Sequence, residues 1–107
     1  MRTVSTIAWM PPMLTPRQRA HLKGRAHALE PVVFIGQAGL SETVVAEVDR
    51  ALTAHGLIKM KLAGTDRADR EALTRDVCAR TDAVAVQNVG RMLVLWRPRP
   101  DDEPLPA

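Results

Sequence analysis

Apolar residues recur at helical spacing in several segments of this chain. Between Ser41 and Gly56 they fall at i, i+1, i+4, i+7 and i+8, which predicts an amphipathic helix with serine as its N-cap and glycine at its C-terminal end. Residues 16–28 carry a narrower apolar strip, and Thr15 followed by Pro16 is a typical helix start. The first half of the chain therefore predicts one short and one long helix.

Two further segments of this half predict strands. Residues 32–35 form a short, continuous apolar run, a pattern typical of a buried parallel strand. Residues 57–62 alternate instead, with apolar side chains on one face and Lys59 and Lys61 on the other. The sheet would therefore have a partly basic face that is open to solvent, or lysine stems that lie under a helix.

The second half predicts one more helix and a hairpin. Asp66 is a typical N-cap, and the helix after it would run for about fifteen residues with a solvated outer face of mixed charge. Its inward-facing residues are predicted to be Ala72, Leu73 and Val77. Residues 83–87 and 91–96 predict two strands, joined by a three-residue loop, 88–90, that has glycine where a left-handed residue is needed.

In chain order these elements predict a single α/β domain, α-β-α-β-α-β-β, with a mixed four-stranded sheet and three helices packed on it. The two crossovers would give parallel pairs of strands, and the hairpin would add an antiparallel strand. A chain of 107 residues is long enough for one such domain and too short for two. We expect residues 1–12 to be a flexible leader, 13–99 the folded domain and 100–107 a disordered acidic and proline-containing tail.

The positive charge of the chain lies near its beginning. Residues 1–30 have a net charge of +4, whereas the remaining residues sum to −1. The basic side chains of the first predicted helix are Arg17, Arg19, Lys23 and Arg25. Such a patch attracts polyanions, although a solvated helix face has the same charge pattern when nothing else supports a binding site.

No catalytic or metal-binding pattern stands out. Ser41 is better explained as a helix cap than as a nucleophile, and His21 and His27 would point about 120° apart on a helix and could not share a metal ion. Cys78, the single cysteine, lies in a helical stretch where a buried small hydrophobe is expected. We therefore expect no enzyme, cofactor, metal site or small-molecule substrate, and a cytoplasmic protein without a signal peptide or membrane span.

The strongest chemical signal is the loop between the first strand and the second helix. Gly36, Gln37, Ala38 and Gly39 form a Gly-x-x-Gly loop before a helix start, where free N–H groups and the helix dipole favour a phosphate. The loop lacks the third glycine of a dinucleotide fingerprint and the Gly-Lys-Ser/Thr of a P-loop. Because the chain has only three aromatic residues, we expect a nucleic acid to be bound by its phosphates and shape and not by a platform of stacking aromatics.

Several motifs in one order make the chain similar to a known family. They are His21-Leu22-Lys23-Gly24-Arg25-Ala26-His27, Pro31-Val32-Val33, Gly36-Gln37-Ala38-Gly39-Leu40, Leu57-Ile58-Lys59-Met60-Lys61, Gln87-Asn88-Val89-Gly90-Arg91 and Leu93-Val94-Leu95-Trp96-Arg97-Pro98. Over about residues 14–98 the chain resembles the YhbY family, the bacterial stand-alone form of the CRM (chloroplast RNA splicing and ribosome maturation) domain. Trp96 stands where tyrosine is common in that family, which we expect to be a tolerated packing change.

The resemblance implies a fold similar to the C-terminal domain of translation initiation factor three, and a function in RNA binding and assembly of the large ribosomal subunit. The residues expected to contact RNA are Gly36, Gln37, Ala38 and Gly39 of the loop, with Arg17, Arg19, Lys23, Arg25, Lys59 and Lys61. The leading hypothesis is a monomer that binds ribosomal RNA in precursors of the large subunit. The alternative is a protein–protein adaptor whose basic helix docks an acidic ribosomal or assembly-factor partner.

Overall fold

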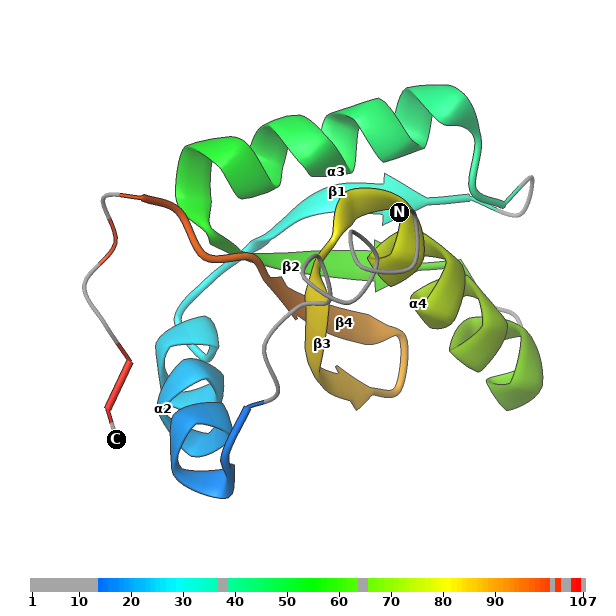
Figure 1. Cartoon of the computed structure of the whole chain (residues 1–107). Coiled ribbons are helices and arrows are strands. Elements are labelled where there is room, and N and C mark those ends of the chain that lie inside the picture. The colour runs from blue at the N-terminus through cyan, green and yellow to red at the C-terminus, as the bar shows by residue number, and fades with distance from the viewer. Residues whose placement is uncertain (1–13, 37–38, 64–65, 101, 103–104, 107) are drawn as a thin grey trace, which may run out of the picture.

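Four strands form one mixed sheet that has helices on both of its faces (Figure 1). The computed structural model describes residues 14–36, 39–63, 66–100, 102 and 105–106 of the chain. In chain order the elements are α2 (Pro16–Ala26), β1 (Pro31–Ile35), α3 (Glu42–His55), β2 (Leu57–Leu62), α4 (Arg67–Thr81), β3 (Val84–Val89) and β4 (Met92–Trp96). Within these residues the predicted fold, three helices and a mixed four-stranded sheet, is confirmed.

The strand order in the sheet is β1-β2-β4-β3. β1 and β2 run parallel, and β4 pairs antiparallel with β2 on one side and with β3 on the other. The prediction that both crossovers give parallel pairs is therefore wrong for the second one, because the hairpin returns β4 into the place between β2 and β3. The sequence of β4 suits this central place, since all four residues from Leu93 to Trp96 are buried.

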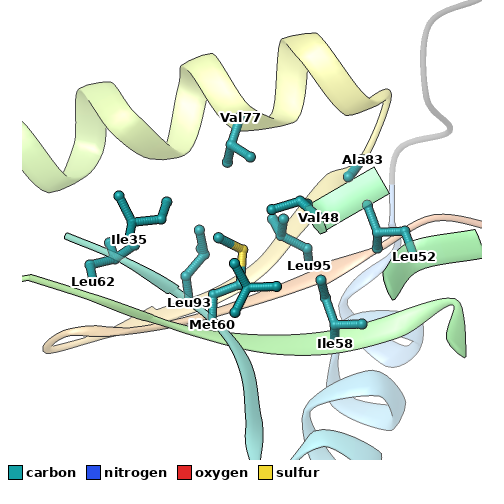
Figure 2. Packing of buried hydrophobic residues seen from close by; sticks show 11 residues of the cluster. Ile35, Val48, Leu52, Ile58, Met60, Leu62, Val77, Ala83, Leu93 and Leu95 are labelled. Carbon is teal, nitrogen blue, oxygen red and sulfur yellow. The ribbon is translucent and has the colours of Figure 1, made fainter. Parts of the chain in front are cut away.

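Helices α3 and α4 cover one face of the sheet and enclose the larger core cluster. Val48 and Leu52 of α3 and Val77 of α4 pack against the strands that lie beneath them (Figure 2). The strands contribute Val33, Ile35, Ile58, Met60, Leu62, Leu93 and Leu95. The three buried residues of β2 in this list confirm the alternation predicted for the second strand.

Helix α2 lies on the opposite face and covers only part of it. Leu22 and Ala26 are buried there in a second cluster, which also contains Leu57, Val86, Val94 and Trp96. These strand residues come from the start of β2 and from β3 and β4. Among the described residues, no helix lies over the part of this face near the other end of β2 and along β1 (Figure 1).

The chain after β4 folds back toward the C-terminal end of α3. Arg97 donates hydrogen bonds to the carboxylate of Asp49 at 2.7 Å and to the carbonyl of Thr81 at 2.8 Å. Arg99 donates to the carboxylate of Asp102 at 2.7 Å, and this hydrogen bond lowers the pKa of that carboxyl. Asp102 belongs to residues 100–107, the segment predicted to be disordered, and that prediction stays a prediction.

Most helix ends lie where the sequence predicts them. The side chains of Thr15, Ser41 and Asp66 each accept a hydrogen bond from a backbone N–H of the first helical turn. Gly56 ends α3 with a φ of +76°, a conformation that favours glycine. Helix α2 ends at Ala26, two residues before the predicted end.

Two local predictions are wrong. Ala72 is exposed, because the apolar residues that α4 turns toward the core are Leu73, Val77 and Cys78. Strand β3 continues to Val89, which pairs with Met92, so Gly90 and Arg91 alone form the hairpin loop. The predicted leader, residues 1–12, lies outside the described residues.

Candidate nucleic-acid interface

The Gly-x-x-Gly loop begins directly after Ile35, the last residue of β1. Gly36 is exposed, and its carbonyl accepts a hydrogen bond from the N–H of Gly39 at 3.0 Å, which closes a tight turn. Gly39 has a φ of +87°, a left-handed conformation that glycine adopts at little cost. A Cβ atom on either glycine would meet nothing within 4 Å, so the space beside both is open. Gln37 and Ala38, also predicted to contact RNA, lie outside the described residues.

Helix α3 starts shortly after the loop. The hydroxyl of Ser41 accepts a hydrogen bond from the N–H of Val44 at 3.2 Å, which is the capping role predicted for this serine. Glu42 lies in the first turn and places a carboxylate at the positive end of the helix dipole. An anion at this end of the domain would therefore depend on the loop backbone and nearby cations more than on the helix terminus.

Part of one sheet face beside this loop is not covered by any of the described helices. Phe34 of β1 lies opposite Lys61 of β2, Lys61 lies opposite Met92 of β4, and Met92 lies opposite Val89 of β3. The four side chains form one row, because residues paired across neighbouring strands point to the same face. Phe34 is 61% exposed and Val89 is 59% exposed. We refer to Val32, Phe34, Lys59, Lys61, Val89 and Met92 as the open face.

Both lysines of β2 belong to the open face. Lys61 is exposed, and Lys59 is half-buried opposite Val94, which α2 covers. Because β1 and β2 are parallel, their C-terminal ends lie at the same edge of the sheet. Lys61 therefore lies beside the end of β1 from which Gly36 leads into the loop, and the basic surface predicted from the sequence is continuous with the predicted phosphate site.

Helix α2 distributes its four basic side chains over several directions. Arg19 is half-buried, and its Nη1 atom donates to two backbone carbonyls of β3 at 2.9 and 2.6 Å. At about 100° per residue, Lys23 and Arg25 project from opposite flanks of the helix. Arg17 is exposed and points away from the buried side of α2. The four residues thus do not form one patch.

Arg25 projects toward a groove that continues from the open face. The groove has a volume of about 300 Å³ and lies between the C-terminal end of α2, β1, β2 and the end of α3. Its lining includes Val32 and Lys59 of the open face together with Arg25, His55 and Glu30. The side-chain nitrogens of Arg25, Lys59 and His55 therefore line the groove together with apolar side chains and one carboxylate.

The single cysteine, Cys78, packs against the larger core cluster. Burial raises the pKa of the Cys78 thiol to about 11, so the thiol is protonated and weakly nucleophilic at neutral pH. Within the described ranges, no three His, Cys, Asp or Glu residues come together as a metal site would require. In the same part of the chain, no helix is both long and apolar enough to cross a membrane.

Known proteins are similar to this sequence over most of its length. Residues 14–97 match the family model of the CRS1/YhbY (CRM) domain. The chain belongs to this family. A Haemophilus influenzae protein named RNA-binding protein is 46% identical to this chain over 85 residues, which are 79% of this chain and 86% of that protein.

Two further proteins extend the comparison. A probable RNA-binding protein of Pseudomonas aeruginosa is 42% identical over 87 residues, 81% of this chain and 84% of that protein. The solution structure of a hypothetical Staphylococcus aureus protein, described as a candidate RNA-binding protein, is similar with a TM-score of 0.77 at 29% sequence identity. The similarity covers 88% of this chain and 100% of that one. The family resemblance predicted from the motifs is thus confirmed by the match of the family model.

The CRM domain brings together only part of the predicted contact set. Its structure places Gly36, Gly39 and Lys61 at one edge, with Lys59 and Arg25 further along the same face and groove. Arg17 and Lys23 project elsewhere from α2, and Arg19 contacts β3.

Sequence reasoning missed the apolar part of the open face. Residues 32–35 were expected to be buried, but only Val33 and Ile35 face the core, because α2 packs on β2, β3 and β4 at the other face. The outward lysines of β2 were the available signal, because a neighbouring strand shares the same solvent-facing side. By that reasoning Phe34 should also be exposed, as the structure has it.

Proposed function

We propose that this CRM domain binds RNA, with the phosphate backbone lying along the Gly-x-x-Gly loop and beside the lysines of the open face. The main support is the parallel pairing of β1 and β2, which puts Lys61 next to the loop that begins at Gly36. Exposed backbone N–H groups and lysine ammonium groups are both common phosphate ligands. The names of the relatives from Haemophilus influenzae and Pseudomonas aeruginosa support the same class of ligand.

The binding that we propose is electrostatic and needs no chemical step. Arg25, Lys59 and Lys61 would neutralise phosphates along one continuous path from the groove to the loop. Each neutralised phosphate of a single strand contributes a slope of about −0.7 to the dependence of log K on log salt concentration. The shielded thiol of Cys78 and the capping role of Ser41 agree with binding without catalysis.

The role that we propose in the cell is assembly of the large ribosomal subunit by a monomer in the cytoplasm. The family resemblance is the support for this role, and the RNA-binding names of the relatives support only the RNA contact that it requires. In-cell crosslinking followed by sequencing of the attached RNA, combined with sedimentation of ribosomal particles, tests this role. We expect crosslinks in large-subunit ribosomal RNA and co-sedimentation with its precursors. Crosslinks confined to other RNAs would contradict the assembly role and leave RNA binding intact.

Gly36→Asp tests the contact with the loop. The substitution puts a carboxylate where a phosphate would lie, and Gly36 has neither a positive φ nor a close neighbour that would strain the fold. We expect at least about tenfold weaker binding to fragments of large-subunit ribosomal RNA, because a charge-assisted hydrogen bond contributes about 1.5–3 kcal/mol. The free energy of unfolding should change by less than about 0.5 kcal/mol.

Ala72→Glu is the matched control for this charge change. Ala72 is exposed on α4, on the opposite side of the sheet from the open face. The variant lowers the net charge by the same amount and should change RNA affinity by less than about twofold, because surface charges separated by more than about 8–10 Å are largely screened at physiological salt. Equal losses in the two variants would mean that only net charge matters and would contradict a specific loop contact.

The directions of Arg17 and Lys23 favour one second candidate function. Both residues project from α2 away from the groove, so they are accessible to an acidic protein while RNA lies on the open face. Capture of a ribosomal or assembly protein that survives nuclease treatment, and that is lost in an Arg17→Gln/Lys23→Gln variant, would support an adaptor function. Loss of all captured protein after nuclease treatment would contradict it.

A further inference from the structure

The open face exposes apolar side chains that phosphate binding does not use. Phe34 is 61% exposed, Val89 59% and Val32 51%, although all three belong to regular strands. Single exposed apolar residues are ordinary, but a contiguous group on a sheet face marks an interaction site. We propose that the open face is a stacking subsite for one unpaired RNA base, with Phe34 as its platform, an inference that rests on the RNA binding proposed above.

The register of the sheet supplies both groups that a nucleotide needs. Phe34 and Lys61 are direct partners across β1 and β2, so an aromatic ring and an ammonium group lie side by side on one face. Met92 and Val89 continue the same row across β4 and β3 as an apolar floor. Within the described part of the chain β1 is an edge strand, so no strand of that part lies beyond Phe34.

The distance to the loop fits a single nucleotide. Phe34 lies two residues before Gly36, and a strand rises about 3.3 Å per residue, so their backbones are roughly 7 Å apart. A nucleotide whose phosphate lies at the loop can therefore place its own base, or the base of its neighbour, over Phe34. The loop would then contact the phosphate, and the ring would contact the base, of one RNA segment.

Charge favours a nucleotide over an apolar protein side chain as the occupant. Lys61 lies in the same cross-strand row as Phe34. The neighbouring cross-strand row consists of Pro31, Lys59, Val94 and Gln87. None of these residues carries a carboxylate. An apolar surface among cations matches a base with its phosphate. Bases inside an RNA duplex are already stacked, so the subsite takes bases from loops, bulges or ends. The chain has too few aromatic residues for a broad stacking platform, but one aromatic ring is sufficient to stack on one base.

Phe34→Leu and Phe34→Trp test the subsite by fluorescence anisotropy, with a labelled single-stranded RNA of about twelve nucleotides and an RNA duplex of the same length as probes. Leucine keeps an apolar side chain and removes the ring. We expect Phe34→Leu to weaken single-strand binding by about fivefold or more, from the usual contribution of base stacking, and to change duplex binding by less than about twofold. Phe34→Trp should keep the affinity, and its added fluorescence, measured against wild-type protein, should be quenched by the single strand.

Lys61→Gln separates this inference from the proposed function. If Lys61→Gln weakens RNA binding and Phe34→Leu does not, the domain binds RNA phosphates but the stacking subsite is wrong. Equal losses of single-strand and duplex binding in Phe34→Leu would also overturn it, because a base inside a duplex cannot stack on the ring. If the wild-type protein binds neither RNA, the proposed function and the subsite both fail. Capture of a protein partner that depends on Phe34, with unchanged RNA binding, would assign the open face to a protein instead.

Discussion

Arg19 is predicted from sequence to contact RNA, and replacing it with methionine tests a structural role instead. Its Nη1 atom donates to the carbonyl of Ala85 at 2.9 Å and to that of Val86 at 2.6 Å. These carbonyls lie where the register between β3 and β4 shifts, at a bulge that interrupts the ladder. The guanidinium group thus ties α2 to the edge strand β3. Methionine keeps most of the length of the side chain and removes the donors.

The expected loss can be worked from these two hydrogen bonds. A hydrogen bond from a charged donor contributes about 1.5–3 kcal/mol to stability. Arg19 is half-buried, and water can partly replace the lost donor, so we take about 1 kcal/mol for each bond. Arg19→Met should therefore lower the free energy of unfolding by about 2 kcal/mol. Arg17→Met, at an exposed position of the same helix, should change it by less than about 0.5 kcal/mol.

Urea unfolding followed by circular dichroism measures this difference. With an m-value of about 2 kcal/mol/M, typical of a small domain, Arg19→Met should lower the midpoint by about 1 M, and Arg17→Met should leave it unchanged within about 0.3 M. Indistinguishable midpoints for the two variants would refute the structural role of Arg19. A loss of RNA affinity in Arg19→Met without any loss of stability would assign the residue to the RNA contact.

Three more predictions follow from individual contacts. Gly39→Ala should cost about 1–2 kcal/mol because of the positive φ, whereas Gly36→Ala should be neutral within about 0.5 kcal/mol; urea unfolding of the pair checks this, and equal effects would contradict the assigned turn. Arg97→Met removes the hydrogen bonds to Asp49 and Thr81 and should lower Tm by about 10 °C, from a loss of about 2 kcal/mol, in a calorimetric scan. Cys78 has a folded-state pKa raised to about 11 from 9.0, so its contribution to stability is complete below pH 9 and is lost as the pH rises toward 11. Unfolding in urea at several pH values should show this fall in wild-type protein and a smaller one in Cys78→Ala.

The sequence predicted the elements well where the signal is local. Thr15, Ser41 and Asp66 cap their helices as predicted, because a cap depends on a hydrogen bond between residues three apart. The glycine loop and the outward lysines of β2 were also predicted from the residues, and the family resemblance added their expected contact with RNA. The residue types and their order along the chain were sufficient to predict these features.

The features that the sequence did not predict depend on contacts between distant segments. An apolar run such as 32–35 does not show whether a strand is covered on one face or on both, so it did not reveal that Phe34 is exposed. The place of β4 follows from pairing on both of its sides, which no local pattern specifies. In the sequence, Arg19 is one of several basic residues of a predicted helix surface. Its structural role depends on the carbonyls of β3, which only the folded structure brings next to it.

The central claim is that RNA phosphates lie along the open face beside the glycine loop. The most direct test is the dependence of log K on log salt concentration for single-stranded RNA, compared between wild-type protein and a Lys59→Gln/Lys61→Gln variant. Arg75→Gln, an exposed position of α4 on the opposite side of the sheet, is the control. We predict that the slope of the double variant is shallower by about 1.4, two contacts of about 0.7 each, and that the slope of the control is unchanged. Equal slopes for the wild-type protein and the double variant would contradict the claim.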